Sequence, residues 1–381
     1  MSTLAEKIAI LRPNPHWAKL PLFDRKWWKT VRFGEVVENL NETCDPQVAG
    51  LERFIGMEHL EPGSLHIRAW GSVADGTTFT RRCGPGQVLF GKRRAYQRKV
   101  AVAEFEAVVS GDIYVLAPKG DRLLPELLPF LCLSERFFQH AVGTSAGSLS
   151  PRTNWSSLAS FEFDLQPLDQ QRRIAEILWA VDTARTACQE TETALLAWRE
   201  AEIRDFRNRS RVSVLCSELL TLASGKAKPK DIREESGGGA SIPVYGGNGI
   251  IGYTAAPLLT EPTVVVGRVG EYCGCVHLAA GNSWITDNAI FVKAHDERLS
   301  LPFLYWMLRA ADLNKKKKIA GQPLISQSTI TEEVIPVPSA KEQTSFLERV
   351  GQLSTAAEAS ATQSKSSSAL LASITNSLSY P

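Results

Sequence analysis

The chain has 381 residues, 44% of them hydrophobic, and carries 43 lysine and arginine residues against 41 aspartate and glutamate residues. That length and apolar content suffice for about two to three folded domains. The formal net charge of +2 excludes a strong attractive field over the whole surface, so a nucleic-acid binder of this composition has to gather its basic residues locally.

The first part of the chain predicts a lead-in and a mixed domain. Residues 1–24 contain Pro13, Pro15 and Pro21, which predict an irregular or helical lead-in. Residues 25–166 are predicted to form the first domain. Within it, short β-prone segments are expected at residues 87–90, 99–103 and 113–116, followed by a helix over residues 125–141.

A long helix is predicted over residues 167–209. Pro167 suits its first turn. Apolar or small residues then recur alternately three and four positions apart, which is typical of a coiled-coil seam. The predicted seam consists of Ile174, Ile177, Val181, Ala184, Cys188, Thr191, Leu195 and Trp198.

The second half repeats this plan. Residues 210–338 are predicted to form another domain, with strands at residues 263–266 and 289–292 and a helix over residues 301–318. Residues 339–381 predict a second long helix. Its seam consists of Phe346, Val350, Leu353, Ala357, Ser360, Ser364, Ser367, Leu371, Ile374 and Leu378.

The second seam is weak in its middle, where serine and alanine predominate, so this helix needs a partner. The first helix in antiparallel orientation is the obvious one. Each helix of about 37 residues would be roughly 55 Å long and would hold the two domains apart.

Parts of the sequence occur twice. Leu128–Leu131 recurs letter for letter as Leu301–Leu304, and the strand-like segment Val109–Val115 has a counterpart in Ile285–Val292. The copies lie roughly 173 to 176 residues apart, so the repeated unit is a whole domain. We therefore predict an α+β fold with two β-rich mixed domains, a long antiparallel two-helix coiled coil between them, and a pseudo-two-fold internal duplication.

Four short motifs superficially suggest enzymes. Residues 86–92 resemble a phosphate-binding loop, but Arg93 stands where serine or threonine is needed and the middle reads as a strand. Residues 143–147 match a nucleophile elbow without the preceding strand, and residues 247–252 match a dinucleotide fingerprint that tight turns between strands explain better. Residues 14–17, Asn-Pro-His-Trp, faintly resemble the Asn-Pro-Pro-Tyr motif of amino-methyltransferases.

Other signals of catalysis or membrane insertion are weak. The seven cysteines form an odd set without a Cys-x-x-Cys pair, and the six histidines lack metal-ligand spacing. No apolar run reaches about 18 residues. We expect a cytoplasmic protein that is not attached to a membrane and has neither a catalytic nor a metal site.

Basic and aromatic residues interleave in a way that suits DNA binding. Residues 92–99 lie between two predicted strands and could track phosphates and read bases, although a solvated hairpin face is the alternative. The candidates in the first half are Lys92, Arg93, Arg94, Tyr96, Arg98, Lys99 and Arg152. Those in the second half are Tyr245, Asn248, Tyr253, Arg268, Lys315, Lys316, Lys317 and Gln322. The lysine run could equally complement a helix dipole.

An ordered set of segments resembles the specificity subunit of type I restriction-modification systems, from about residue 27 to the C-terminus. In the first half these are Val88–Ala103, Ser110–Ile113, Ser148–Arg152 and Pro167–Leu178. In the second half they are Ile242–Tyr253, Trp284–Asp287 and Ile335–Gln343. One departure is that residues 341–346 read Lys-Glu-Gln-Thr-Ser-Phe where residues 169–174 read Asp-Gln-Gln-Arg-Arg-Ile.

The resemblance implies a non-catalytic DNA-reading subunit. Each domain would read one half of a bipartite, asymmetric site in double-stranded DNA, and the coiled coil would fix the gap. Two methyltransferase (M) subunits would supply S-adenosylmethionine, and restriction (R) subunits would supply ATP hydrolysis with Mg, so this chain would bind no cofactor itself. A DNA-modifying enzyme acting alone and a protein-only coiled-coil adaptor are the alternatives.

Overall fold

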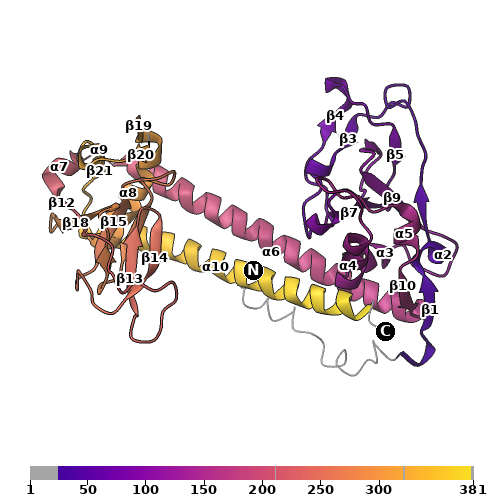
Figure 1. Cartoon of the computed structure of the whole chain (residues 1–381). Coiled ribbons are helices and arrows are strands. Elements are labelled where there is room, and N and C mark those ends of the chain that lie inside the picture. Colours follow the sequence, from indigo (N-terminus) through magenta and orange to yellow (C-terminus); the bar gives the residue numbers. More distant parts are fainter. Residues whose placement is uncertain (1–24, 211, 321, 379–381) are drawn as a thin grey trace. The chain divides into compact units, whose positions relative to one another are not determined.

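The computed structural model describes residues 25–210, 212–320 and 322–378 (Figure 1). The predicted lead-in over residues 1–24, with its Asn-Pro-His-Trp motif, lies outside them. By its contacts the described chain divides into two units. Unit 1 runs to Cys188 and resumes at Thr362, and unit 2 comprises Gln189–Ala361.

Unit 1 is built around two four-stranded sheets, in the orders β2-β9-β6-β7 and β4-β3-β8-β5, and a small β1-β10 pair. Its strands are β1 (Lys29–Arg32), β2 (Val37–Leu40), β3 (Arg53–Ile55), β4 (Gly71–Ser72), β5 (Arg81–Cys83), β6 (Val88–Gly91), β7 (Val100–Val102), β8 (Ala107–Val109), β9 (Ile113–Pro118) and β10 (Glu162–Leu165). Its helices are η2 (Arg25–Trp27), α2 (Phe33–Val36), η3 (Met57–His59), η4 (Val73–Asp75), η5 (Ala95–Gln97), α3 (Leu128–Leu133), α4 (Glu135–Gly143) and α5 (Trp155–Ala159).

Unit 2 repeats this arrangement with sheets in the orders β12-β18-β15-β16 and β14-β13-β17, and the pairs β11-β21 and β19-β20. Its strands are β11 (Ser213–Leu215), β12 (Leu220–Ser224), β13 (Ile242–Gly246), β14 (Gly249–Thr254), β15 (Thr263–Gly267), β16 (Val276–Ala279), β17 (Trp284–Ile285), β18 (Ala289–His295), β19 (Lys318–Ala320), β20 (Gln322–Leu324) and β21 (Val334–Pro336). Its helices are α7 (Cys216–Leu219), α8 (Leu301–Ala310), η6 (Leu313–Lys316) and α9 (Gln327–Thr331).

The sheet β2-β9-β6-β7 of unit 1 is buried on both faces. Successive side chains of a strand point to opposite faces. Val88 and Phe90 of β6 therefore pack in one core cluster with the helical residues Phe130 and Phe137, while Leu89 between them packs with the second sheet. Such double burial produces the short, continuous apolar runs that mark these strands in the sequence.

The two units share one strand register. Leu89 of β6 pairs with Val115 of β9, and Val265 of β15 pairs with Phe291 of β18, so the pairing recurs with a shift of 176 positions. The β6-β7 and β15-β16 ladders repeat with the same shift. The predicted internal duplication is confirmed.

The two long helices are α6 (Leu168–Arg209) and α10 (Ala340–Leu378), labelled in Figure 1. In unit 1, Ile174 of α6 shares a core with Leu371 of α10. In unit 2, Ile203 shares a core with Phe346. The start of each helix thus meets the end of the other, which confirms the predicted antiparallel pairing.

A buried glutamine begins each long helix in the same way. Oε1 of Gln171 accepts a hydrogen bond from the N–H of Leu124 (2.9 Å), and Oε1 of Gln343 accepts one from the N–H of Ser300 (2.8 Å). Nε2 of Gln171 donates to the carbonyl oxygen of Arg122 (2.8 Å), and Nε2 of Gln343 donates to that of Arg298 (2.6 Å), in each case two residues before the residue whose N–H bonds to Oε1. The contact shared by the two boundaries is therefore made by the glutamine, not by the arginine pair found only at the first.

The predicted seam of α10 is confirmed, since every residue from Phe346 to Leu378 in it is buried or half-buried. The predicted seam of α6 is confirmed at Ile174, Ile177, Val181, Ala184, Cys188 and Leu195, which are buried or half-buried, but it is wrong at Thr191 and Trp198, which are exposed. Trp198 is 63% exposed, whereas Asp182 is 0% exposed. The most deeply buried positions between Ile177 and Cys188 are Leu178, Asp182 and Arg185, each one residue after a predicted seam position, and two of them are charged.

Most predicted strands are confirmed, but two predicted helices are wrong in extent. The helix expected over residues 125–141 is broken at Ser134, where the backbone is extended. The helix expected over residues 301–318 ends at Ala310, because Asp312 adopts a left-handed conformation (φ 49°). As expected, residues 86–92 contain a strand, and Gly247 and Asn248 form the turn between β13 and β14.

Candidate nucleic-acid interface

The basic segment of residues 92–99 connects the antiparallel strands β6 and β7. Its backbone turns sharply, with Arg94 and Arg98 in the left-handed region (φ 52° and 55°) on either side of η5. The N–H of Arg94 donates to the carbonyl oxygen of Pro151 (2.7 Å), and the N–H of Thr153 donates to that of Lys92 (3.0 Å). Residues 92–99 and Arg152, predicted to act together, therefore lie together.

A carboxylate that was not predicted lies at the centre of this cluster. Asp112 pairs with Arg93 at 3.3 Å and with Arg152 at 2.7 Å. Burial alone would raise the pKa of Asp112, but the hydrogen bonds and charges of Arg152 and Arg93 outweigh it and hold this pKa below its usual value. Nε of Arg93 also donates to Oγ of Ser150 (2.7 Å). Both guanidinium groups are thus held in fixed positions.

Positive charge is nevertheless in excess around Asp112. Nζ of Lys92 lies 4.9 Å from the ring centroid of Tyr114. Partial burial, together with the charge of Arg81, lowers the pKa of Lys92 despite the pull of Asp112. Lys92, Arg81 and the two arginines bound to Asp112 give four cations to one carboxylate. Such a cluster is poised for an anion.

The remaining residues of the connection differ in availability. Arg98 pairs with Glu135 and lowers the pKa of that carboxyl through its hydrogen bond, and Nζ of Lys99 donates to the carbonyl oxygen of Met57 (2.6 Å). Tyr96 is 55% exposed. Nε of Arg94 is buried and has no hydrogen-bond partner among the residues the structure describes.

Unit 2 contains the same backbone arrangement after β15. The N–H of Arg268 donates to the carbonyl oxygen of Asn288 (2.9 Å), as the N–H of Lys92 does to that of Asp112 (2.9 Å). The N–H of Gly270 donates to the carbonyl oxygen of Pro323 (3.0 Å), as Arg94 does to that of Pro151. Arg268 and Gln322 are exposed and lie on the adjoining segments.

The side chains of the two arrangements differ. The isolated bridge between Arg93 and Arg152 in unit 1 corresponds to one between Val269 and Leu324 in unit 2. Asp112 corresponds to Asn288. The arrangement in unit 2 thus lacks both arginines and also the carboxylate that holds them, and it keeps an exposed cation at Arg268.

The lysine run is engaged within the chain. Lys315 pairs with Asp312, and Lys317 pairs with Glu271. Lys316 pairs with Glu333, a 5% exposed carboxylate. Lys315 and Lys316 lie in η6, beyond the end of α8, so the run does not cap that helix.

The β13-β14 hairpin presents only some of its predicted residues. Asn248 is exposed at the turn and Tyr253 is half-buried on β14. Tyr245 is 8% exposed in a core with Ile285, so its ring does not lie on the surface with them.

Two further observations concern the described residues as a whole. No group of three or more histidine, cysteine, aspartate or glutamate side chains among them is arranged to hold a metal ion. None of the helices in this part of the chain is long and apolar enough to cross a membrane.

Comparisons in sequence point to one family. The family model described as Type I restriction modification DNA specificity domain matches residues 213–365. The type I restriction enzyme EcoprrI specificity subunit of Escherichia coli is 26% identical over 150 residues, which cover 39% of this chain and 36% of that protein. The EcoDI specificity subunit, also from Escherichia coli, is 25% identical over 169 residues, 41% of this chain and 36% of that protein. The match spans little more than a third of these curated relatives.

Solved structures share the fold over almost the whole chain. The S subunit of a type I restriction-modification system from M. genitalium superposes with a TM-score of 0.65 at 14% identity, covering 95% of this chain and 99% of that one. A structure described as underlying complex assembly and conformational transition of the type I R-M system gives a TM-score of 0.57 at 18% identity, covering 92% and 96%. The second half of the chain thus matches the family model of type I restriction-modification specificity domains, and the fold of almost the whole chain is similar to that of the solved type I S subunit.

Proposed function

We propose that this chain reads a bipartite, asymmetric site in double-stranded DNA, one half with residues 25–166 and the other with residues 210–338. One observation carries the proposal: the same loop arrangement is built twice on the same backbone hydrogen bonds, with different side chains. A shared scaffold with changed surface chemistry suits two readers of the same kind of ligand that read different sequences.

The cluster around Asp112 suits DNA in particular. Arginine contacts guanine bidentately, and excess cations neutralise phosphates. Arg93 and Arg152 are fixed by Asp112, so binding would cost them little side-chain entropy. Copy 2, with Val269 and Leu324 at the equivalent positions, offers apolar groups that suit a different base edge.

The chain itself would be non-catalytic within a larger complex. Two methyltransferase subunits would bring S-adenosylmethionine and modify adenine, and restriction subunits would bring ATP and Mg. The similarity of residues 213–365 to specificity domains of type I systems supports these partners, and the duplicated fold would offer one equivalent surface to each methyltransferase subunit.

Mapping methylated adenines in cells that express this chain with its methyltransferase subunits tests the proposal. The expected result is a split motif with a fixed gap and two different halves. A single uninterrupted motif, or no motif, would contradict it. Stabilisation of the purified chain by S-adenosylmethionine would favour a DNA-modifying enzyme instead, and failure to bind any duplex with partners present would favour the adaptor.

A further inference from the structure

The two copies differ in the connection that follows their matching strands β3 and β13. Each of these strands pairs in parallel with its neighbour, β3 with β8 and β13 with β17, and antiparallel with the next strand. In unit 2 the antiparallel pair is joined by Gly247 and Asn248 alone. In unit 1 the corresponding link, here called the connection 56–70, is far longer.

The connection 56–70 is packed against the domain. Leu60 and Leu65 are each 1% exposed, and Ile67 is 5% exposed. The N–H of Val102 on β7 donates to the carbonyl oxygen of Leu65 (2.8 Å). His66 is therefore held between two buried residues, Leu65 and Ile67, beside β7, the strand that follows the basic loop.

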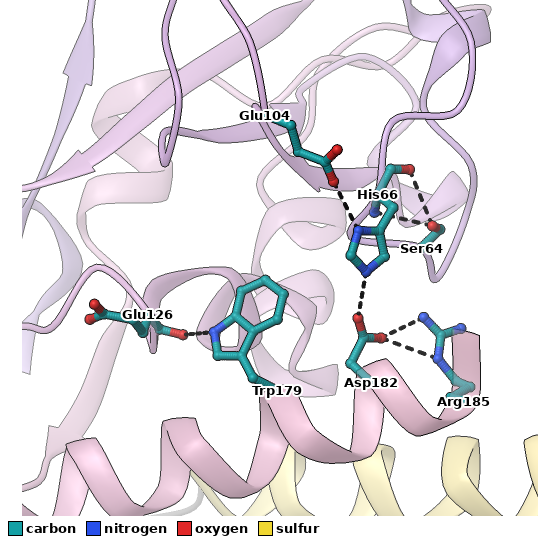
Figure 2. A network of polar contacts seen from close by, with 7 residues as sticks. All are labelled: Ser64, His66, Glu104, Glu126, Trp179, Asp182 and Arg185. Atoms are coloured by element: carbon teal, nitrogen blue, oxygen red, sulfur yellow. Dashed lines mark hydrogen bonds and ion pairs between the residues drawn. The ribbon is translucent and has the colours of Figure 1, made fainter. Parts of the chain in front are cut away.

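His66 joins this connection to the long helix α6 (Figure 2). Its Nε2 lies 3.1 Å from Oδ2 of Asp182, and its Nδ1 lies 2.9 Å from Oε1 of Glu104. NH2 of Arg185, one turn further along α6, donates to the other oxygen of Asp182 (2.6 Å). In Figure 2 these side chains form a continuous chain from Glu104 to Arg185.

A second contact lies beside the first on α6. Nε1 of Trp179 donates to the carbonyl oxygen of Glu126 (3.0 Å), and its ring packs edge-on against Phe130 at 5.1 Å. Trp179 and Asp182 are three residues apart and so share one face of the helix. Two directional contacts on one face fix how the helix is turned relative to the domain.

The burial of a charged residue, Asp182, in α6 suggests that its contact with His66 orients the domain on the helix. Asp182 is 0% exposed at a position where an apolar residue would stabilise the helix pair more cheaply. A buried polar residue in a coiled coil is best known for specifying register. Counted from the matching glutamines Gln171 and Gln343, the equivalent position on α10 is Ser354, whose Oγ bonds to Val350 of its own helix and to Arg199. Among the described residues, Ser354 therefore has no contact with the β-rich part of unit 2 like that of Asp182 with His66.

We propose that Asp182 is a positioning residue, which through His66 fixes the first recognition domain on α6 and thereby sets the gap between the two DNA half-sites. This inference rests on the proposed function. It assigns the strictness of the gap to the contact between His66 and Asp182, which has no counterpart at the equivalent described position, Ser354, of unit 2.

The test compares H66A and D182N, each in the full chain with its methyltransferase subunits, by mapping methylated adenines. Removing a hydrogen bond to a charged group is typically worth at least about a tenfold change. We therefore expect sites with gaps one base pair longer or shorter to gain about tenfold in methylation over the wild type, with both half-site sequences unchanged. In H66A the Asp182 carboxylate keeps Arg185, so this variant answers the question even where D182N does not fold.

The matched control is H295A, because His295 is an exposed histidine in unit 2 whose ring nitrogen Nδ1 hydrogen-bonds the carbonyl oxygen of the next residue, Asp296. It should leave the gap preference unchanged. A strict native gap in both variants would overturn the positioning role, as would a uniform loss of methylation at every gap. If the wild-type complex marks no split motif, the proposed function fails instead, so the two failures are distinguishable.

Discussion

At the scale of single residues, the two copies hold one backbone arrangement and differ in the side chains that it displays. The pair Arg93 and Arg152 occurs with Asp112, and the pair Val269 and Leu324 occurs with Asn288. A carboxylate without its arginines would be a partly buried unpaired charge, so the three positions have to change together.

Removing one arginine of the cluster should weaken DNA binding and its dependence on salt. We expect R93A and R152A each to lower the log-log salt slope by about 0.9 if the lost contact is to a phosphate, because fewer counterions are released. A lost base contact would instead reduce discrimination at one position by about 1–3 kcal/mol. Titrations of a duplex at several salt concentrations measure both.

The matched control for this experiment is K119A. Lys119 is an exposed cation directly after β9, at the opposite end of that strand from Ile113, which pairs beside the loop. Affinity and slope that match this control in both arginine variants would return residues 92–99 to the alternative of a solvated face.

The variant D112N should show a pH-dependent loss of stability. Because the folded-state pKa of Asp112 is depressed, its contribution is present above the unfolded-state pKa of about 3.9 and is lost as pH falls through the folded-state pKa. The urea midpoint of D112N should therefore lie below that of the wild type at pH 7, and the difference should shrink towards pH 3. A difference independent of pH would mean that the ionised carboxylate is not what stabilises the cluster.

The sequence pointed to the loop but not to its centre. Asp112 lies 19 residues from Arg93 along the chain, and the pairing of β6 with β9, which sets Gly91 opposite Ile113, brings them together. Local patterns report charge runs, whereas this contact depends on a long-range strand register. Tyr245 was misplaced for a related reason, since nothing local distinguishes a buried tyrosine of β13 from a surface one.

At the scale of elements, the two long helices show where periodicity succeeds and where it fails. The seam of α10 could be predicted because apolar residues occupy its two ends, small residues occupy its middle, and no charged residue stands in it. On α6 the true seam includes Asp182 and Arg185, and Val181 offers a more apolar but less buried alternative. A search for apolar periodicity cannot detect a charged residue that is buried because it forms an ion pair.

The corrected seam predicts unequal effects for two neighbours. Leu178 is 0% exposed in the core of unit 1, whereas Ile177 is half-buried. We expect L178A to cost about 2–5 kcal/mol, in the range of fully buried leucines, and I177A to cost clearly less. Urea unfolding monitored by circular dichroism compares them directly. Equal losses would restore the original seam.

Lengthening both helices tests whether they act as a ruler. Insertion of one heptad after Cys188 in α6 and one after Ala361 in α10 adds about 10.5 Å of helix, or roughly three base pairs at 3.4 Å each. The methylated motif should keep both halves and acquire a longer gap. A changed base preference with the original gap would contradict the ruler.

At the scale of the whole molecule, the duplication implies that recognition is modular. The segment 210–338 should be replaceable by that of a relative without altering what residues 25–166 read, because the two segments belong to separate compact units and sites that share no partners contribute additively. The methylation map of such a chimera should show the old first half and a new second half. If both halves change in a chimera that still assembles, recognition is a joint property and the two-reader model is wrong. The unexchanged chain, expressed with the same methyltransferase subunits, is the control for assembly.

The link between His66 and Asp182 also bears on how such genes can recombine. A crossover at the codons of Pro167 would deliver a new first domain next to the old Asp182, which would then be buried without its histidine wherever the incoming domain lacks one. A crossover after the codon of Arg185 inherits domain and anchor together. The heritable module of the first half is therefore longer than its folded β-rich part, and related genes that have exchanged first domains should change sequence beyond residue 185, not at the start of the helix.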